Sequence, residues 1–117
     1  MTDVPIIRVG ATLICPVHED LTDAEALAFQ EALNRRIEQT DAHAVLIDVS
    51  LVVTIDSFLG RLLHETALGA RLLGAETVIC GMQPAVAMTL VELGLDLGGI
   101  RTALTTDRGL QMLGSGS

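Results

Sequence analysis

Apolar residues along this chain follow two different spacings, and the alternation between them most constrains the fold. Short runs rich in β-branched residues, typical of strands, alternate with longer stretches in which apolar residues recur every three or four positions, as in amphipathic helices. From the N-terminus the runs predict the order strand, strand, helix, strand, helix, strand, helix, strand, helix. Strands that alternate with helices pair in parallel, so the order predicts an α/β domain with a mainly parallel sheet and about four helices.

The N-terminal part is the exception to this parallel pattern. The expected strands at residues 4–9 and 12–17 are separated only by Gly10-Ala11, which predicts a hairpin and therefore an antiparallel strand in the sheet. Pro16 lacks a backbone N–H, so we expect it at an edge position or a bulge.

The first two helices have clear signals. Thr22 and Glu25 have the spacing of a capping box, which predicts that a helix begins there. A buried strand is expected at residues 44–49, and a strand-like run at residues 52–55 leads to a second helix from about Ser57 to Gly74. The residues expected on the apolar faces are Ala26, Phe29, Leu33 and Ile37 in the first helix, and Leu59, Leu62, Leu63, Thr66, Ala70 and Leu73 in the second.

The remaining elements are shorter. We expect a buried strand at residues 77–81, a helix opened by Pro84 that ends at Gly94, and a strand at residues 100–104. Thr106-Asp107 predicts the cap of a last helix through residue 113. The third helix carries its apolar residues at Ala87, Met88 and Val91. We therefore predict one domain over residues 1–113, followed by a flexible Gly/Ser tail at 114–117.

Charge and composition exclude several classes of function. The chain has 7 basic residues, all arginine, against 15 acidic ones, a net charge of −8 that disfavours nucleic acid. No apolar run approaches the ~18 residues of a membrane span, and the N-terminus lacks a signal-peptide pattern, so a soluble, cytoplasmic domain without membrane contact is expected. Cys15 and Cys80 lie in apolar runs without metal-ligand spacing, which predicts two buried thiols and no metal site.

Motifs of catalysis are missing from the sequence. The chain has no phosphate-binding loop, no dinucleotide fingerprint and no nucleophile elbow around Ser57, so we predict a non-catalytic protein without a cofactor. Asp48 ends a buried strand like the acceptor of a phosphorelay receiver. The lysine and the acidic pair of such domains are absent, however, so Asp48 is interpreted as a strand-end group that binds neighbouring backbone.

Asp56-Ser57, at the start of the second helix, allows two interpretations. Either residue suits a helix N-cap. The same position also suits a phosphoserine, because helix N-terminal amides favour a phosphate that adds roughly −1.5 to −2 charges beside Asp56. Phe58 is either an exposed anchor for a partner or a part of the core.

The sequence resembles the STAS domain family, the fold of anti-sigma-factor antagonists, and within it the RsbS-type stressosome branch. The resemblance is carried by Ile-Asp-Ser-Phe (55–58) and is most specific at GMQPAVAMTLVELG (81–94). Residues 28–31 and 102–104 add to it, and the similarity extends over about residues 6–113.

The resemblance implies a scaffold protein that sequesters a switch kinase. The family's acceptor serine maps onto Ser57, phosphorylated by an RsbT-like serine kinase and reset by an RsbX-like phosphatase. RsbR-like STAS proteins are the implied partners in a large assembly.

A docking surface is expected around this serine. We predict that Asp56, Phe58, Gln83 and Pro84 contribute to it, because they follow neighbouring strands. Two alternatives stay open: a free RsbV-type antagonist that binds an anti-sigma kinase, and a STAS module that senses a small ligand.

Overall fold

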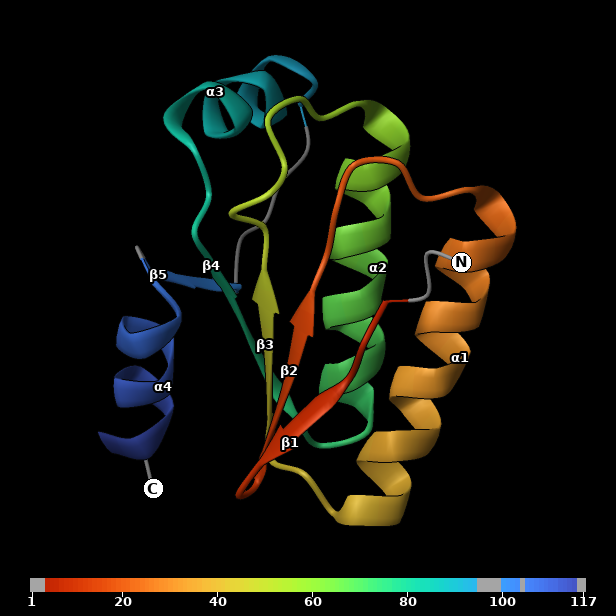
Figure 1. The fold of residues 1–117 in the computed structure, drawn as a ribbon, viewed down its shortest axis with the longest axis vertical. Coiled ribbons are helices and arrows are strands. Elements are labelled where there is room, and N and C mark those ends of the chain that lie inside the picture. The colour runs from red at the N-terminus through yellow and green to blue at the C-terminus, as the bar shows by residue number, and fades with distance from the viewer. Residues whose placement is uncertain (1–3, 95–99, 104, 116–117) are drawn as a thin grey trace.

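The computed structural model describes residues 4–94, 100–103 and 105–115, and its elements follow the predicted order (Figure 1). The elements are β1 (Ile7–Val9), β2 (Thr12–Pro16), α1 (Asp23–Thr40), β3 (Ala44–Asp48), α2 (Ser57–Leu72), β4 (Glu76–Cys80), α3 (Pro84–Glu92), β5 (Arg101–Ala103) and α4 (Thr106–Ser115).

The sheet has the strand order β1-β2-β3-β4-β5. β1 pairs antiparallel with β2, and all other pairs are parallel, as the sequence predicts. β2 is an internal strand, but β1 pairs with it only as far as Ile14. Pro16 pairs with Asp48 of β3 and lies beyond the last β1 partner, so its missing N–H leaves no gap on that side.

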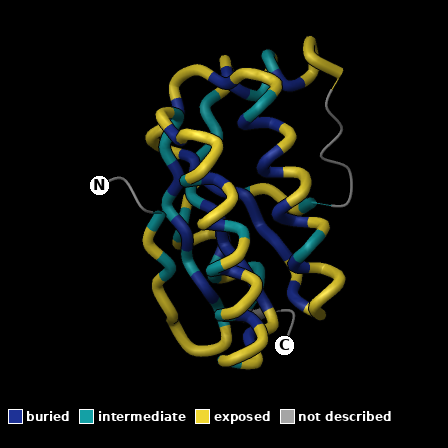
Figure 2. The backbone as a smooth tube through the Cα atoms, turned by 90° about the vertical axis from the view of Figure 1, so that its right-hand side faces the viewer, coloured by how far each residue is buried: buried dark blue, intermediate teal, exposed yellow. Residues whose placement is uncertain are grey.

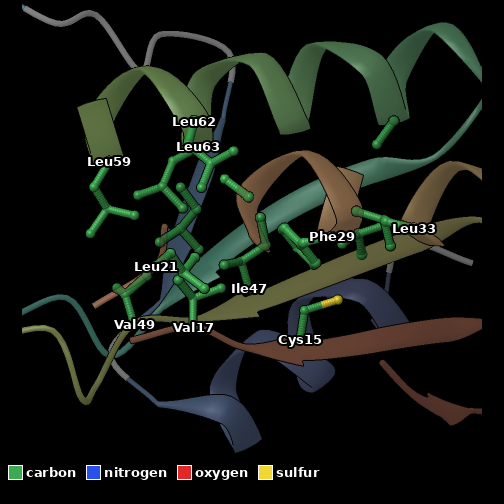
Figure 3. Packing of buried hydrophobic residues seen from close by; sticks show 14 of the residues in the cluster. Cys15, Val17, Leu21, Phe29, Leu33, Ile47, Val49, Leu59, Leu62 and Leu63 are labelled. Atoms are coloured by element: carbon green, nitrogen blue, oxygen red, sulfur yellow. The ribbon is translucent and has the colours of Figure 1, made fainter. Parts of the chain in front are cut away.

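Two helical layers enclose the sheet. α1 and α2 lie together on one face, and α4 lies on the other (Figure 1). Figure 3 shows Phe29 of α1 and Leu63 of α2 packed toward Ile47 of β3. On the opposite face Gly109 of α4 lies so close to Leu46 that a Cβ atom there would come within 2.6 Å of the leucine Cδ1. The central strands β3 and β4 are the most buried part of the chain, whereas β1 and β5 at the two edges of the sheet are largely exposed (Figure 2).

The first helix agrees closely with its prediction. Thr22 Oγ1 accepts from the Glu25 amide at 3.1 Å, and Glu25 Oε1 accepts from the Thr22 amide at 2.9 Å, so the capping box is complete. The four residues expected on the apolar face are all buried: Ala26, Phe29, Leu33 and Ile37.

The apolar faces of the next two helices differ in part from the prediction. Leu73 is 39% exposed, because α2 ends at Leu72 and the chain turns at Gly74. In α3 the buried residues are Val86 and Leu90, whereas Met88 is 64% exposed. α3 is almost uniformly apolar, so its spacing alone did not indicate which face would meet the core.

Several boundaries also differ, the first being that of β1, which begins at Ile7 and not at residue 4 as expected. Residues 52–55 form an irregular loop in which Val52 and Ile55 are buried, not the expected strand-like run. The cap of α4 is Thr105, whose Oγ1 accepts from the Arg108 amide at 3.2 Å, and Thr106 is already helical. α4 continues to Ser115, so residues 114 and 115 are helical where a flexible tail was expected; Leu104 and residues 116–117 lie outside the described residues.

The two cysteines are buried and free, as predicted. Burial raises the pKa of the Cys15 thiol from 9.0 to about 12, which keeps it protonated and unreactive at neutral pH. Within the described ranges, no helix combines the length and apolar character required to cross a bilayer.

Candidate functional site

The start of α2 separates the two interpretations of the Asp56-Ser57 pair. Asp56 is the N-cap, and its Oδ1 accepts from the Leu59 amide at 2.9 Å. Ser57 is therefore the first helical residue. Its side chain is exposed, and its hydroxyl makes no hydrogen bond within the part of the chain that the structure describes. The capping role belongs to the aspartate, which leaves the serine free for other chemistry.

The surroundings of Ser57 are electrostatically mixed. The backbone N–H groups of Ser57 and Phe58 have no acceptor among the described residues, so they add to the positive end of the helix dipole. Arg61 lies one turn further and donates from Nε to the Ser57 carbonyl at 3.3 Å. The exposed carboxylate of Asp56 supplies the opposing negative charge. A phosphate on Ser57 would meet attraction from the helix and repulsion from Asp56.

Phe58 is neither a free anchor nor a fully buried residue. It is partly buried and packs against the main core. It also lines a cavity of about 280 Å³ between α1 and α2, together with Leu27 and Arg61. Its ring therefore fixes the first turn of α2 and exposes only part of its surface.

The loop that leads to Ser57 is held by a residue that the sequence analysis missed. Glu19, in the β2–α1 loop, accepts at Oε2 from the amides of Val53 and Thr54, at 3.1 and 2.7 Å. The same oxygen accepts from the Thr54 hydroxyl at 2.9 Å. These hydrogen bonds lower the pKa of Glu19, with the Thr54 amide as the main cause. No local motif marks Glu19, because its partners lie more than thirty residues away in the sequence.

We expect the Glu19 hydrogen bonds to make the stability of the chain depend on acid pH. A carboxylate with a lowered folded pKa stabilises the fold above its unfolded value of 4.5, and this contribution is lost as the pH falls through the folded pKa. The difference in urea midpoint between wild type and E19Q should therefore be largest near pH 7 and shrink below about pH 4.5. E38Q, at an exposed position of α1, controls for the loss of one negative charge. An E19Q difference that stays constant from pH 7 to pH 3 would contradict this prediction.

The next loop is joined to the first through Ser50. Gln83 donates from Nε2 to the Ser50 carbonyl at 3.3 Å, and Pro84 follows as the exposed first residue of α3. Asp48 Oδ1 accepts from the Ser50 amide at 2.9 Å, which confirms its interpretation as a strand-end group bound to backbone. Gln83 is therefore bound to residues 48–50. These residues begin the loop that leads through Asp56 to Ser57.

Gly81 allows the close approach of these two loops. Its φ of +76° lies in the left-handed region. A Cβ atom on Gly81 would lie 2.9 Å from Ser50 Cβ and 3.1 Å from Asp48 Oδ1. Only glycine therefore fits this position without moving the loop that precedes the candidate serine.

Comparison with solved structures finds close similarity over nearly the whole chain. A form of RsbS from Moorella thermoacetica that carries a serine-to-glutamate substitution is 37% identical, with a TM-score of 0.85 and 97% of each chain covered. A chain from a structure of the architecture of the stressosome is 39% identical, also with a TM-score of 0.85, and the match covers 95% of this chain and 96% of that one.

Curated proteins with similar sequences are longer. The RsbT co-antagonist protein RsbRA of Bacillus subtilis is 30% identical over 108 residues, which cover 92% of this chain and 39% of RsbRA. The chain likewise spans about a third of the related proteins RsbRD and RsbRB, at 32% and 35% of their lengths. The similarity is therefore confined to one part of each of these relatives.

The family model of the STAS domain matches residues 4–107, most of the chain. The five-stranded sheet with its antiparallel first strand and four helices agrees with this match. The chain belongs to the STAS domain family.

Proposed function

We propose that this STAS protein is a non-catalytic scaffold of a stressosome-like assembly, which holds a switch serine kinase and releases it when Ser57 is phosphorylated. The observation that carries the proposal is the exposed hydroxyl of Ser57 on the first turn of α2, which has no hydrogen-bond partner among the described residues. The similarity to RsbS over nearly the full length of both chains supports it.

The switch acts through charge. Unmodified Ser57 presents a small neutral hydroxyl beside Asp56 and the backbone amides at the start of α2. Phosphorylation replaces it with a group of about −1.5 to −2 charges. A kinase seated against this surface then loses a close contact and meets a concentrated negative charge. The energy of this repulsion is large because a docked partner excludes water and lowers the local dielectric constant.

The docking surface combines this charge with apolar side chains of the preceding loop. Leu51 is 68% exposed and Val53 is 54% exposed, although each lies close in sequence to fully buried valines. Gln83 and Pro84 add a polar and an apolar group from the neighbouring loop. Apolar contacts surrounded by polar groups are the usual composition of a protein interface.

Gln83 provides a test of this surface. Q83A removes the amide that donates to the Ser50 carbonyl and the polar group it presents to a partner. We expect the affinity for the cognate kinase to fall by about three- to tenfold, the equivalent of one lost hydrogen bond. Isothermal titration calorimetry with the kinase measures the change. Q39A, on an exposed position of α1, is the matched control. Equal affinities of the two variants for the kinase would show that Gln83 is not part of the docking surface.

The assembly is tested separately from the switch. The proposal expects RsbR-like STAS proteins as partners and an RsbX-like phosphatase that removes the phosphate. Size-exclusion chromatography with an RsbR-like partner should give a particle far larger than the 12.3 kDa chain. A free RsbV-type antagonist would instead elute as a small species in the presence of that partner.

The decisive experiment is phosphorylation of the full chain by its cognate switch kinase with ATP. Mass spectrometry of the peptide that contains residues 56–60 should show one added phosphate on Ser57. The exposed serine at position 50 is an internal control, because it lies in the same loop but not on a helix N-terminus. Phosphate on Ser50 instead of Ser57 would refute the assignment of the switch.

A further inference from the structure

A cavity of about 410 Å³ lies beside the second half of α2, at the side of the sheet where β4 and the start of β5 meet. Its volume is within the range of small-molecule sites in proteins. Within the described ranges, its apolar lining includes Ala67 and Leu68 of α2, Ala75 in the turn after it, and Ile100 before β5. These side chains offer a hydrophobic surface for an aliphatic group.

A buried threonine hydroxyl belongs to the same cavity. Thr77 lies on β4, is only 6% exposed and lines the cavity. It pairs in register with Val45, whose side chain belongs to the core under α1 and α2, so Thr77 faces the same side of the sheet. Thr77 Oγ1 has no hydrogen-bond partner in the described chain. An unsatisfied buried hydroxyl is costly, and a ligand atom that pairs with it would be stabilised.

The polar lining includes one arginine, Arg71, although the chain as a whole carries a net charge of −8. Arg71 and His64 lie seven residues apart on α2, hence on the same face of the helix. Among the described lining residues, the one acidic side chain is Glu76, and it is paired with Arg101 at 2.7 Å. Arg71 has no ion pair among the residues that the structure describes. A guanidinium with free donors is suited to a carboxylate or phosphate.

We propose that this cavity binds a small anion with an aliphatic body, a short-chain carboxylate or alkyl phosphate. Arg71 and the imidazole of His64 bind the anionic group, and Thr77 supplies a further hydrogen-bonding group. The alkyl portion packs against Leu68, Ala75 and Ile100. Both candidate ligands have one anionic group on a short apolar chain. Separate titrations distinguish the carboxylate from the phosphate.

This inference does not depend on the proposed switch. Arg71 lies fourteen residues after Ser57 on the same helix, a rise of about 21 Å. The cavity therefore lies toward the opposite end of α2 from the docking surface, and ligand binding is measurable without a kinase.

The test is calorimetric titration of the full chain with hexanoate and, separately, with hexyl phosphate. We expect at least one of them to bind with a dissociation constant of about 1 mM or tighter, as is usual for ligands of this size. R71Q should weaken binding at least tenfold, and T77V about threefold. Hexylammonium, which has the same chain and the opposite charge, should bind at least tenfold more weakly to wild type. R35Q, an exposed arginine of α1 outside the cavity, is the matched control and should bind like wild type.

Three results would overturn the proposal. The first is the absence of binding by both anions, and the second is equal affinity of R71Q and wild type. The third is equal binding of hexylammonium and hexanoate, which would reduce the site to a nonspecific apolar surface. Amide chemical shifts should change upon hexanoate addition at residues 64–77 and stay constant at 56–58; the reverse pattern would place the ligand elsewhere.

Discussion

Replacing Ser57 with alanine is expected to abolish phosphorylation by the switch kinase, while the chain folds and binds that kinase as before. The hydroxyl makes no hydrogen bond in the described structure, and Asp56 keeps the cap of α2, so the free energy of unfolding should change by less than about 0.5 kcal/mol. The kinase should therefore stay bound to S57A after ATP is added, whereas it leaves the wild type. Kinase retention on immobilised protein, before and after ATP, measures this difference.

Aspartate at the same position should have the opposite effect on the kinase. S57D places a second carboxylate beside Asp56, and we expect the affinity for the kinase to fall at least tenfold without ATP. The effect should be smaller than that of true phosphorylation, because one carboxylate carries less charge than a phosphate. Arg61, which already contacts the Ser57 carbonyl, partly neutralises the new group.

The controls distinguish a switch from general damage to the surface. S50A changes the other exposed serine near the site. This variant should be phosphorylated on Ser57 and should release the kinase like wild type. S57N adds the bulk of aspartate without its charge. Equal kinase binding by wild type, S57A and S57D would rule out a switch at this residue, and equal weakening by S57N and S57D would show that size rather than charge matters.

Gly81→Ala is expected to be the most destabilising substitution near the site. The φ of +76° costs an alanine about 1–2 kcal/mol. The new Cβ atom would also approach Ser50 Cβ to 2.9 Å and Ser50 Cα to 3.2 Å, and a backbone atom cannot move aside as a flexible side chain can. Together we expect a loss of about 2–4 kcal/mol in the free energy of unfolding, measured by urea denaturation.

Gly74→Ala is the matched control for backbone strain alone. Its φ is +89°, but no atom of the described residues lies within 4 Å of the Cβ position. Gly74 follows the C-cap of α2, where its amide donates to Arg71 and the next amide, of Ala75, donates to Ala70. We expect a loss of about 1–2 kcal/mol here. Equal losses for the two variants would show that the contact between Gly81 and Ser50 adds nothing.

The sequence predicted those elements that are determined by interactions between residues close together in the chain. The capping box at Thr22 and Glu25 and the buried face of α1 are determined within a few turns of one helix, and both are confirmed. The antiparallel pairing of β1 and the parallel order of the other strands also agree with the prediction, although β1 has three residues where a strand over residues 4–9 was expected. Helix α3 was harder because nearly all of its residues are apolar, and the choice of buried face depended on where the sheet lies.

The candidate site was predictable only in part. The exposure of Ser57 agrees with its predicted place at the start of a helix, although the sequence did not decide whether Asp56 or Ser57 forms the cap. Glu19 could not be found from sequence, because a carboxylate in a loop has no spacing relation to amides thirty-four and thirty-five residues away. The cavity beside α2 likewise requires residues from a helix, a turn, the strand β4 and the segment just before β5.

The sequence by itself determined the order of strands and helices, the parallel sheet with its antiparallel first strand, and the position of one serine at a helix start. These follow from spacing, capping and turn residues, whose energies act between neighbours in the chain. The tertiary structure alone decided that Glu19 holds the loop before Ser57, that Gly81 must lie against Ser50, and that Thr77 and Arg71 share a cavity. Such contacts join residues that are distant in sequence, and they exist only after the sheet has brought the ends of its strands together.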